Sequence, residues 1–291
     1  MPLLPVIETV LPVFLIAALG YFYGRRFDTD IENMNRLNMD VFIPALIFSA
    51  LSAKGFDIAS YQALMLAGIA VVLGSGLLVL PFLPLIRVQW KTFVPPMMFT
   101  NSGNMGIPIL LLAFGSDVLP AAIILFLAEN TLHFTLGMYL LNHRAGFLRV
   151  LRTPMILASI AGIVVSLTGI TLPRAISAPV DMIGQIAIPL MLFTLGIRMV
   201  QADFSDARLG IIAGILAPAS GLTMAWLISP FLNLDPTQQA CLYVFACLPP
   251  AVLNYMVAEK YNQEPKKVAS IVFIANLMAV ITLPIVLARV L

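Results

Sequence analysis

A group of polar residues interrupts one of the long apolar stretches of this chain. Asn101, Ser102 and Asn104 stand shortly before Pro108 in the segment 92–116, which has no acidic, basic or histidine residue. Amides and hydroxyls donate hydrogen bonds without a formal charge, and the proline predicts a break in any helix here because it lacks the backbone donor. We expect these side chains to bind an anionic group, or else to cap and pack a kinked helix.

A second apolar stretch carries a matching interruption. Pro249 and Pro250 lie about 145 residues beyond the first break, and Asn254 follows them. Unwound backbone at membrane depth needs protein or a water-filled cavity to receive it, and paired interruptions indicate a transporter's binding site. The half-helices expected to begin near Met105 and Ala251 would direct N–H groups to the point where the broken helices cross. Such N–H groups favour a carboxylate-bearing solute.

Ionisable residues also lie within a predicted span. Glu129 is followed by Asn130, and His133 stands four residues on, so it shares a helical face with Glu129. An ionisable group inside the membrane is a functional hypothesis by default. The pair could share a proton, bind a cation such as Na⁺ together with Asn130, or hold two helices together. Two such ligands are too few for a zinc site, so we expect neither a metal site nor a cofactor.

Three further polar positions belong to spans that contain a proline. Asp40 stands four residues before Pro44, where it either faces a translocation path and takes part in ion coupling or lies at an arginine-rich cytoplasmic rim. Ser49 and Thr194 occupy similar positions after the prolines of their spans. Each hydroxyl either lines the path or bonds back to its own helix.

The elements that must position these residues are membrane helices. Of the 291 residues, 60% are hydrophobic and 10% are charged, and the mean hydropathy is +1.00. Soluble proteins carry about 45–50% apolar and about 25% charged residues, so separate soluble domains are excluded.

Long continuous apolar runs favour helices over the alternating strands of a barrel. The sequence predicts an all-α fold with ten spans, at residues 9–24, 41–53, 58–86, 92–116, 118–128, 153–173, 182–197, 209–234, 236–258 and 268–288. The second is expected to extend back to about Asn35, and the fifth on to Asn142.

The basic residues predict the orientation. Thirteen of the sixteen fall in the loops after odd-numbered spans, and only Lys54, Arg174 and Arg289 lie on the other side. Because cytoplasmic loops carry the excess of Lys and Arg, we expect the odd-numbered loops in the cytoplasm and both termini outside. The net charge of +2 is small; the expected surroundings are a lipid bilayer, with no nucleic-acid partner.

The two halves of the chain resemble one another. Residues 43–49 are similar to residues 188–194 at an offset of 145, and Phe126-Leu127-Ala128 resembles Phe273-Ile274-Ala275 at an offset of 147. A repeat with an odd number of spans has its second copy inverted in the membrane, as in several secondary transporters. The predicted repeats are residues 1–143 and 144–291.

Enzymatic motifs are not evident. The sequence has no phosphate-binding Gly-x-x-x-x-Gly-Lys loop. Gly115-Ser116-Asp117 is similar to an aspartyl protease motif, but a carboxylate dyad requires contact, and Asp40 is expected on the opposite side of the membrane. We expect no enzyme.

Together these residues resemble the auxin efflux carrier family, which includes plant PIN-type exporters and bacterial carriers. The resemblance covers essentially the whole chain. The matching residues are Met34-Asn35-Arg36, Ile43-Pro44, Asn101, Met105-Gly106-Ile107-Pro108, Leu248-Pro249-Pro250 and Ala258-Glu259-Lys260-Tyr261-Asn262.

The resemblance implies a fold shared with sodium/bile-acid symporters and sodium/proton antiporters. Helices 1, 2, 6 and 7 would form a scaffold domain, and helices 3–5 and 8–10 a transport domain with an elevator movement. It also implies a homodimer and a substrate site at Asn101, Pro108 and Pro249. The chain departs from the plant exporters at Pro250, Glu129 and His133.

The sequence therefore predicts a bacterial inner-membrane transporter of a small organic anion, a mono- or dicarboxylate such as malate or malonate. Transport would be facilitative or coupled to H⁺ or Na⁺. Two alternatives stay open: a receptor or regulatory subunit that binds the ligand without translocating it, and a channel.

Overall fold

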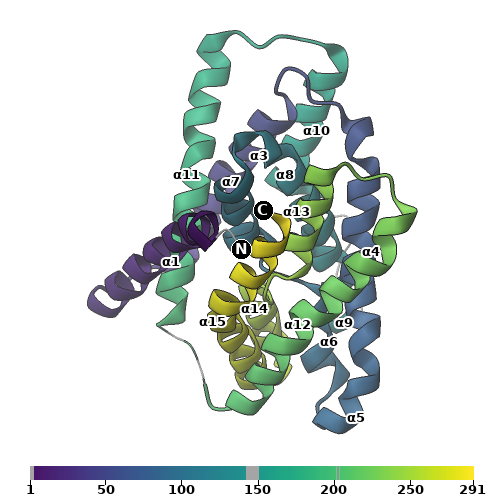
Figure 1. Cartoon of the computed structure of the whole chain (residues 1–291). Helices are drawn as coiled ribbons and strands as arrows, with labels where there is room; N and C mark the ends of the chain where they lie inside the picture. Colours follow the sequence, from purple (N-terminus) through teal and green to yellow (C-terminus); the bar gives the residue numbers. More distant parts are fainter. Residues whose placement is uncertain (1–2, 142–150, 201, 203) are drawn as a thin grey trace. The chain divides into compact units, whose positions relative to one another are not determined.

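The chain is built from helices. The computed structural model describes residues 3–141, 151–200, 202 and 204–291 (Figure 1). Within these residues it contains no strand, only an isolated antiparallel bridge between Thr100 and Pro250. Six helical segments are long and apolar enough to cross a membrane: Leu4–Arg26, Ile58–Ile86, Ser116–Leu141, Arg174–Met199, Ala207–Phe231 and Pro265–Val290. The predicted all-α membrane class is confirmed.

The chain divides into two compact units. The first comprises Met1–Pro12, Ala63–Ala145 and Gln201–Leu291, and the second comprises Val13–Gln62 and Gly146–Val200.

The second unit contains most of α1 (Leu3–Arg26), followed by α2 (Ile31–Leu37), α3 (Ile43–Leu51), α10 (Pro154–Thr168) and α11 (Arg174–Met199). A π-helical turn, Asn38–Phe42, joins α2 to α3, so the second predicted span does continue back through Asp40. Helix α11 packs closely on α3, because a Cβ atom at Gly184 would lie 2.8 Å from the backbone of Leu46. Helix α10 ends where Gly169 adopts a left-handed conformation, with φ of 66°.

The first unit holds the two stretches with predicted breaks. Its N-terminal part contains α4 (Gln62–Val79), α5 (Leu83–Ile86), α6 (Trp90–Met98), α7 (Ile107–Phe114), α8 (Leu119–Leu132) and α9 (Met138–Leu141). Its C-terminal part contains α12 (Ala207–Ile228), α13 (Pro236–Ala246), α14 (Val252–Lys260) and α15 (Pro265–Val290). A π-helical turn, His133–Gly137, joins α8 to α9.

Large side chains and close helix contacts make the core of this unit. Phe93, Phe99, Phe245 and Phe273 are fully buried. Helix α12 packs along α15, and at Gly221 it reaches the last residue of α13, where a Cβ atom would overlap the carbonyl oxygen of Ala246. Glycine is required at this contact, which fixes the end of α13 just before the second break.

Candidate functional site

The first predicted break is present, and it begins slightly earlier than expected. Helix α6 ends at Met98, and Phe99 is extended, with φ of −101° and ψ of 105°. A π-helical turn, Ser102–Gly106, then leads into α7. Pro108 lies in the first turn of α7, which continues directly from the π-helical turn. The first half-helix therefore ends at Met98, before Pro108, and the second begins at Ser102.

The second predicted break is also present. Helix α13 ends at Ala246 and α14 begins at Val252, with Pro249 and Pro250 between them. Ala251 precedes α14 in an extended conformation, with ψ of 142°. The start of this half-helix agrees with the expectation from sequence.

The two breaks lie against each other. The backbone N–H of Asn101 donates to the carbonyl of Pro249 at 2.7 Å, and the N–H of Ala251 donates to the carbonyl of Phe99 at 2.9 Å. These bonds form the bridge between Thr100 and Pro250. Backbone N–H and C=O groups that make no hydrogen bond within a helix are therefore paired with the backbone of the other break. Such pairing is needed where no water is present to bond with them.

Three buried amides reinforce this crossing. The side chain of Asn101 donates to Oδ1 of Asn276 in α15 at 2.8 Å. Asn276 in turn donates to the carbonyls of Pro250 at 2.9 Å and Val272 at 2.8 Å. Asn254 donates to the carbonyl of Phe99 at 2.8 Å. Each amide therefore ties one break to another part of the unit.

The amide groups of Asn101 and Asn254 are thus occupied in holding the crossing. These side chains are only 3% and 4% exposed. Asn104 is half-buried. Two buried oxygen atoms, Oγ1 of Thr100 and Oδ1 of Asn254, have no hydrogen-bond partner among the described residues. Polar capacity therefore remains at the crossing, and buried polar atoms of this kind usually have a partner.

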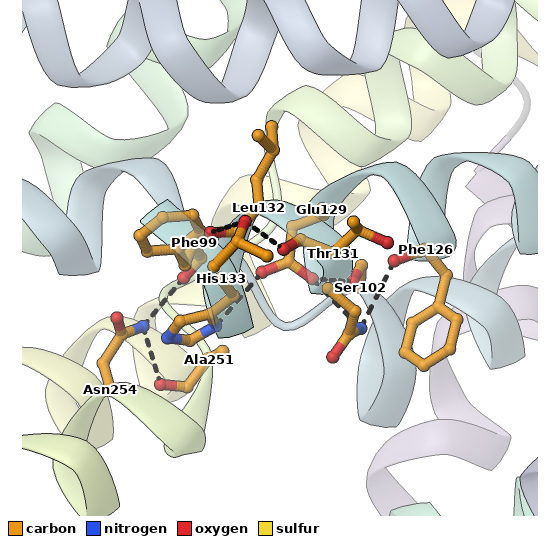
Figure 2. Close-up of polar contacts among 11 residues, drawn as sticks. Phe99, Ser102, Phe126, Glu129, Thr131, Leu132, His133, Ala251 and Asn254 are labelled. Atoms are coloured by element: carbon orange, nitrogen blue, oxygen red, sulfur yellow. Dashed lines mark hydrogen bonds and ion pairs between the residues drawn. The ribbon is translucent and has the colours of Figure 1, made fainter. Parts of the chain in front are cut away.

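A buried carboxylate connects α8 to the first break (Figure 2). Glu129 is 2% exposed, and its Oε2 atom accepts hydrogen bonds from Ser102 at 2.7 Å and from Asn130 at 3.3 Å. Its Oε1 atom lies 3.4 Å from Nδ1 of His133. The predicted grouping of Glu129, Asn130 and His133 is therefore present, and Ser102 joins it to the crossing.

His133 extends the group to a small pocket. Its ring stacks on Phe99, with ring centroids 4.2 Å apart and planes 7° apart. His133, Asn254 and Lys91 all line one small pocket. The free volume is about 10 Å³, roughly the space of one water molecule.

The remaining predicted positions belong to the second unit. Ser49 donates a hydrogen bond of 2.5 Å to Asp181 of α11, so its hydroxyl does not bond back to its own helix. Thr194 does bond back, to the carbonyl of Met191 at 3.1 Å. Asp40 lies in the π-helical turn with its side chain exposed.

Sequence reasoning missed two polar residues within helices. Asn276 was not singled out, although aligning Phe126-Leu127-Ala128 with Phe273-Ile274-Ala275 places Asn276 opposite Glu129. Both residues contact a break, Glu129 through Ser102 and Asn276 through the carbonyl of Pro250. Asp181 was missed because it borders an apolar stretch and lies inside α11 in the structure.

No group of three His, Cys, Asp or Glu side chains that could hold a metal ion occurs in the described part of the chain. The chemistry of the crossing is that of amides, hydroxyls, peptide N–H groups and one carboxylate–histidine pair. These groups can bind a small anion or a proton.

The comparisons with known proteins agree with this architecture. The chain matches the membrane transport protein family over residues 5–148 and 138–287. It is 28% identical to an "Uncharacterized transporter" of Methanothermobacter thermautotrophicus, over 96% of each chain. It is 24% identical to a "Putative malonate transporter" of Rhizobium meliloti, over 94% of this chain and 92% of the relative. It is 21% identical to the "Uncharacterized transporter YfdV" of Escherichia coli K12, over 96% of each. The matches span both halves and both breaks, and the chain belongs to the membrane transport protein family, the auxin efflux carrier family.

Proposed function

We propose that this membrane transporter carries a small organic anion, a mono- or dicarboxylate, by alternating access. The observation that carries the proposal is the pairing of two interrupted helices at Thr100 and Pro250. Paired interruptions with polar backbone are the arrangement in which secondary transporters hold a solute at mid-membrane. The printed name of the Rhizobium meliloti relative includes malonate, which supports a dicarboxylate as the first substrate to test.

The anion would be held by partial positive charges. The N–H groups of Met105 and Gly106 donate to the carbonyl of Asn101, so they are satisfied. The N–H groups of residues 102–104 come earlier in the turn, where a helix has no carbonyl partners of its own. Together with the half-buried amide of Asn104 and the start of α14, they would receive a carboxylate. Such a site binds an anion without a fixed cation, which favours release.

The proposed movement is that of an elevator. The division into two units supports it, because both broken stretches and their partners α8 and α15 belong to the first unit. This unit would be the transport domain, and the unit with α3, α10 and α11 the scaffold. We propose two inverted five-helix repeats, a homodimer, and an inner-membrane location with both termini on the extracytoplasmic side.

Coupling to an ion would reside at Glu129 and His133. Glu129 contacts His133 and also accepts a hydrogen bond from Ser102, which belongs to the first break. The pocket between Lys91 and His133 would give a proton access to this pair. Protonation or Na⁺ binding at Glu129 would change its bond with Ser102 and so the shape of the break.

A ligand screen tests the substrate class. Purified protein is expected to gain thermal stability with malonate or malate and to show no gain with neutral amino acids. Asn104→Ala should lower the apparent affinity, whereas Thr223→Ala, on the exposed face of α12, should leave it unchanged. Stabilisation by neutral solutes alone would contradict an anion site. Binding without flux into liposomes would favour a receptor.

A further inference from the structure

A second pocket of the first unit lies where three membrane-length helical segments end. Its volume is about 160 Å³, roughly tenfold what one water molecule requires. Three basic residues line it from three different parts of the chain: Arg87 after α5, Arg208 at the start of α12, and Lys267 at the start of α15. The apolar side chains of Leu209 and Ile212 line it as well.

The charges of this basic pocket are mostly unneutralised. Neither Arg87 nor Arg208 forms an ion pair with any acidic group of the described residues, and both side chains are exposed. Lys267 pairs with Glu264. Asp206 also lines the pocket, but its Oδ1 atom accepts from the N–H of Leu209 at 3.2 Å and caps α12. The two arginines are therefore the free cations of the pocket among the described residues.

The position of the pocket indicates which anions can reach it. Arg87 directly follows the candidate span Ile58–Ile86, and Arg208 and Lys267 lie at the start of two others. Span ends lie at the depth of lipid headgroups. Trp90, which is 42% exposed, stands three residues after Arg87, and exposed tryptophan is typical of the membrane interface.

We propose that this basic pocket binds a phosphate group, supplied by the headgroup of an anionic phospholipid. The planar guanidinium groups of Arg87 and Arg208 suit bidentate bonds to phosphate oxygens. The apolar side chains of Leu209 and Ile212 would lie beside the glycerol and the upper acyl chain. Basic pockets between membrane helices recognise headgroups in this way. The proposal does not depend on the transported solute.

Native mass spectrometry of the detergent-purified full chain tests the proposal. The protein is mixed with phosphatidylglycerol or with phosphatidylcholine, and inorganic phosphate is added as a competitor. We expect phosphatidylglycerol to be retained in preference to phosphatidylcholine. The double variant Arg87→Gln/Arg208→Gln should retain it about tenfold less, because the charge-assisted bonds are lost. The matched control is Lys266→Gln, an exposed basic residue next to Lys267 that does not line the pocket.

Each outcome of this experiment supports or overturns the proposed phosphate site. Loss of lipid in the double variant but not in Lys266→Gln supports a headgroup site. Binding of inorganic phosphate that fails in the same double variant supports the phosphate chemistry with free phosphate as its source. Arg87→Lys/Arg208→Lys, which keeps the charge, should give an intermediate loss and guards against misfolding as the cause. Equal retention in the wild type and the double variant, or equal loss in Lys266→Gln, overturns the proposal.

Discussion

The side-chain amide of Asn101 donates a 2.8 Å hydrogen bond to the side-chain oxygen of Asn276. Asn101 lies in the break between α6 and α7, whereas Asn276 lies within the continuous helix α15. Asn276 also donates to the carbonyl of Pro250 in the other break. One residue of an unbroken helix therefore bonds to both interruptions and ties the crossing to α15.

Asn276→Ala is expected to destabilise the protein and to reduce transport. It removes the partner of Asn101 and leaves the buried carbonyl of Pro250 one donor short, a loss of about 1–3 kcal/mol. Thermal unfolding in detergent and transport in liposomes measure the two effects. The matched control is Leu277→Ala, because Leu277 is the next residue of α15 and is exposed. Equal effects of the two substitutions would show that Asn276 has no special role.

Glu129→Gln is expected to preserve the fold while removing the pH or Na⁺ dependence of transport. Glutamine keeps an oxygen that can accept from Ser102, but it cannot be ionised. The measurement is the initial transport rate across a range of pH, with and without Na⁺, for the wild type and the variant. The control Asn130→Ala removes the weaker 3.3 Å contact with the carboxylate and a bond to the carbonyl of Phe126, but leaves the ionisable group in place. If both dependences persist in Glu129→Gln, the residue is structural.

Glu264, the ion-pair partner of Lys267 in the basic pocket, makes the stability of the folded protein depend on pH. Burial raises the pKa of this carboxyl, but hydrogen bonds from Lys267 and Thr92 outweigh burial and lower the pKa below its ordinary value. Because the pKa of Glu264 is lower in the folded than in the unfolded protein, the ionised carboxylate stabilises the fold at pH values above the unfolded pKa of about 4.3. This stabilisation is lost as the pH falls through the pKa of Glu264 in the folded protein. Glu264→Gln should therefore be less stable than the wild type at pH 7.

Thermal unfolding at several pH values checks this expectation. The difference between wild type and Glu264→Gln should shrink as the pH falls below about 4. Glu259→Gln, at an exposed position near the end of α14, serves as the control and should show a smaller difference. A difference that stays constant from pH 7 to pH 3 would mean that the ionised carboxylate contributes nothing.

The features that could be predicted from the sequence are those set by local backbone geometry, namely the helix breaks and the residues that share a helical face. Pro249 and Pro250 lack the backbone donor that a helix interior uses, and their match with the first break 145 residues earlier placed the second break. Proline alone does not decide, because Pro95 and Pro96 lie inside α6. The grouping of Glu129 with His133 followed from helical periodicity alone. The first break was expected near Asn101–Pro108, and it begins slightly earlier because α6 already ends at Met98.

Tertiary partners could not be predicted in the same way. That a polar residue such as Asn101 lies in a membrane segment indicates that it matters, but not whether its amide is open to a ligand or bonded to the protein. Its bond to Asn276 depends on how α15 packs, which local sequence does not encode. The contact between Ser49 and Asp181 likewise joins residues 132 positions apart.

Uptake of radiolabelled malonate into liposomes that contain the purified protein tests the central claim most directly. The wild type and Thr223→Ala should transport the label, Asn101→Ala should abolish transport, and Asn104→Ala should raise the half-saturating concentration several-fold, because one amide donor to the carboxylate is removed. Asn104 makes the sharper test, since its half-buried side chain does not hold the crossing together. Malonate uptake that is unchanged in both Asn101→Ala and Asn104→Ala would contradict a substrate site at the crossing of the two broken helices.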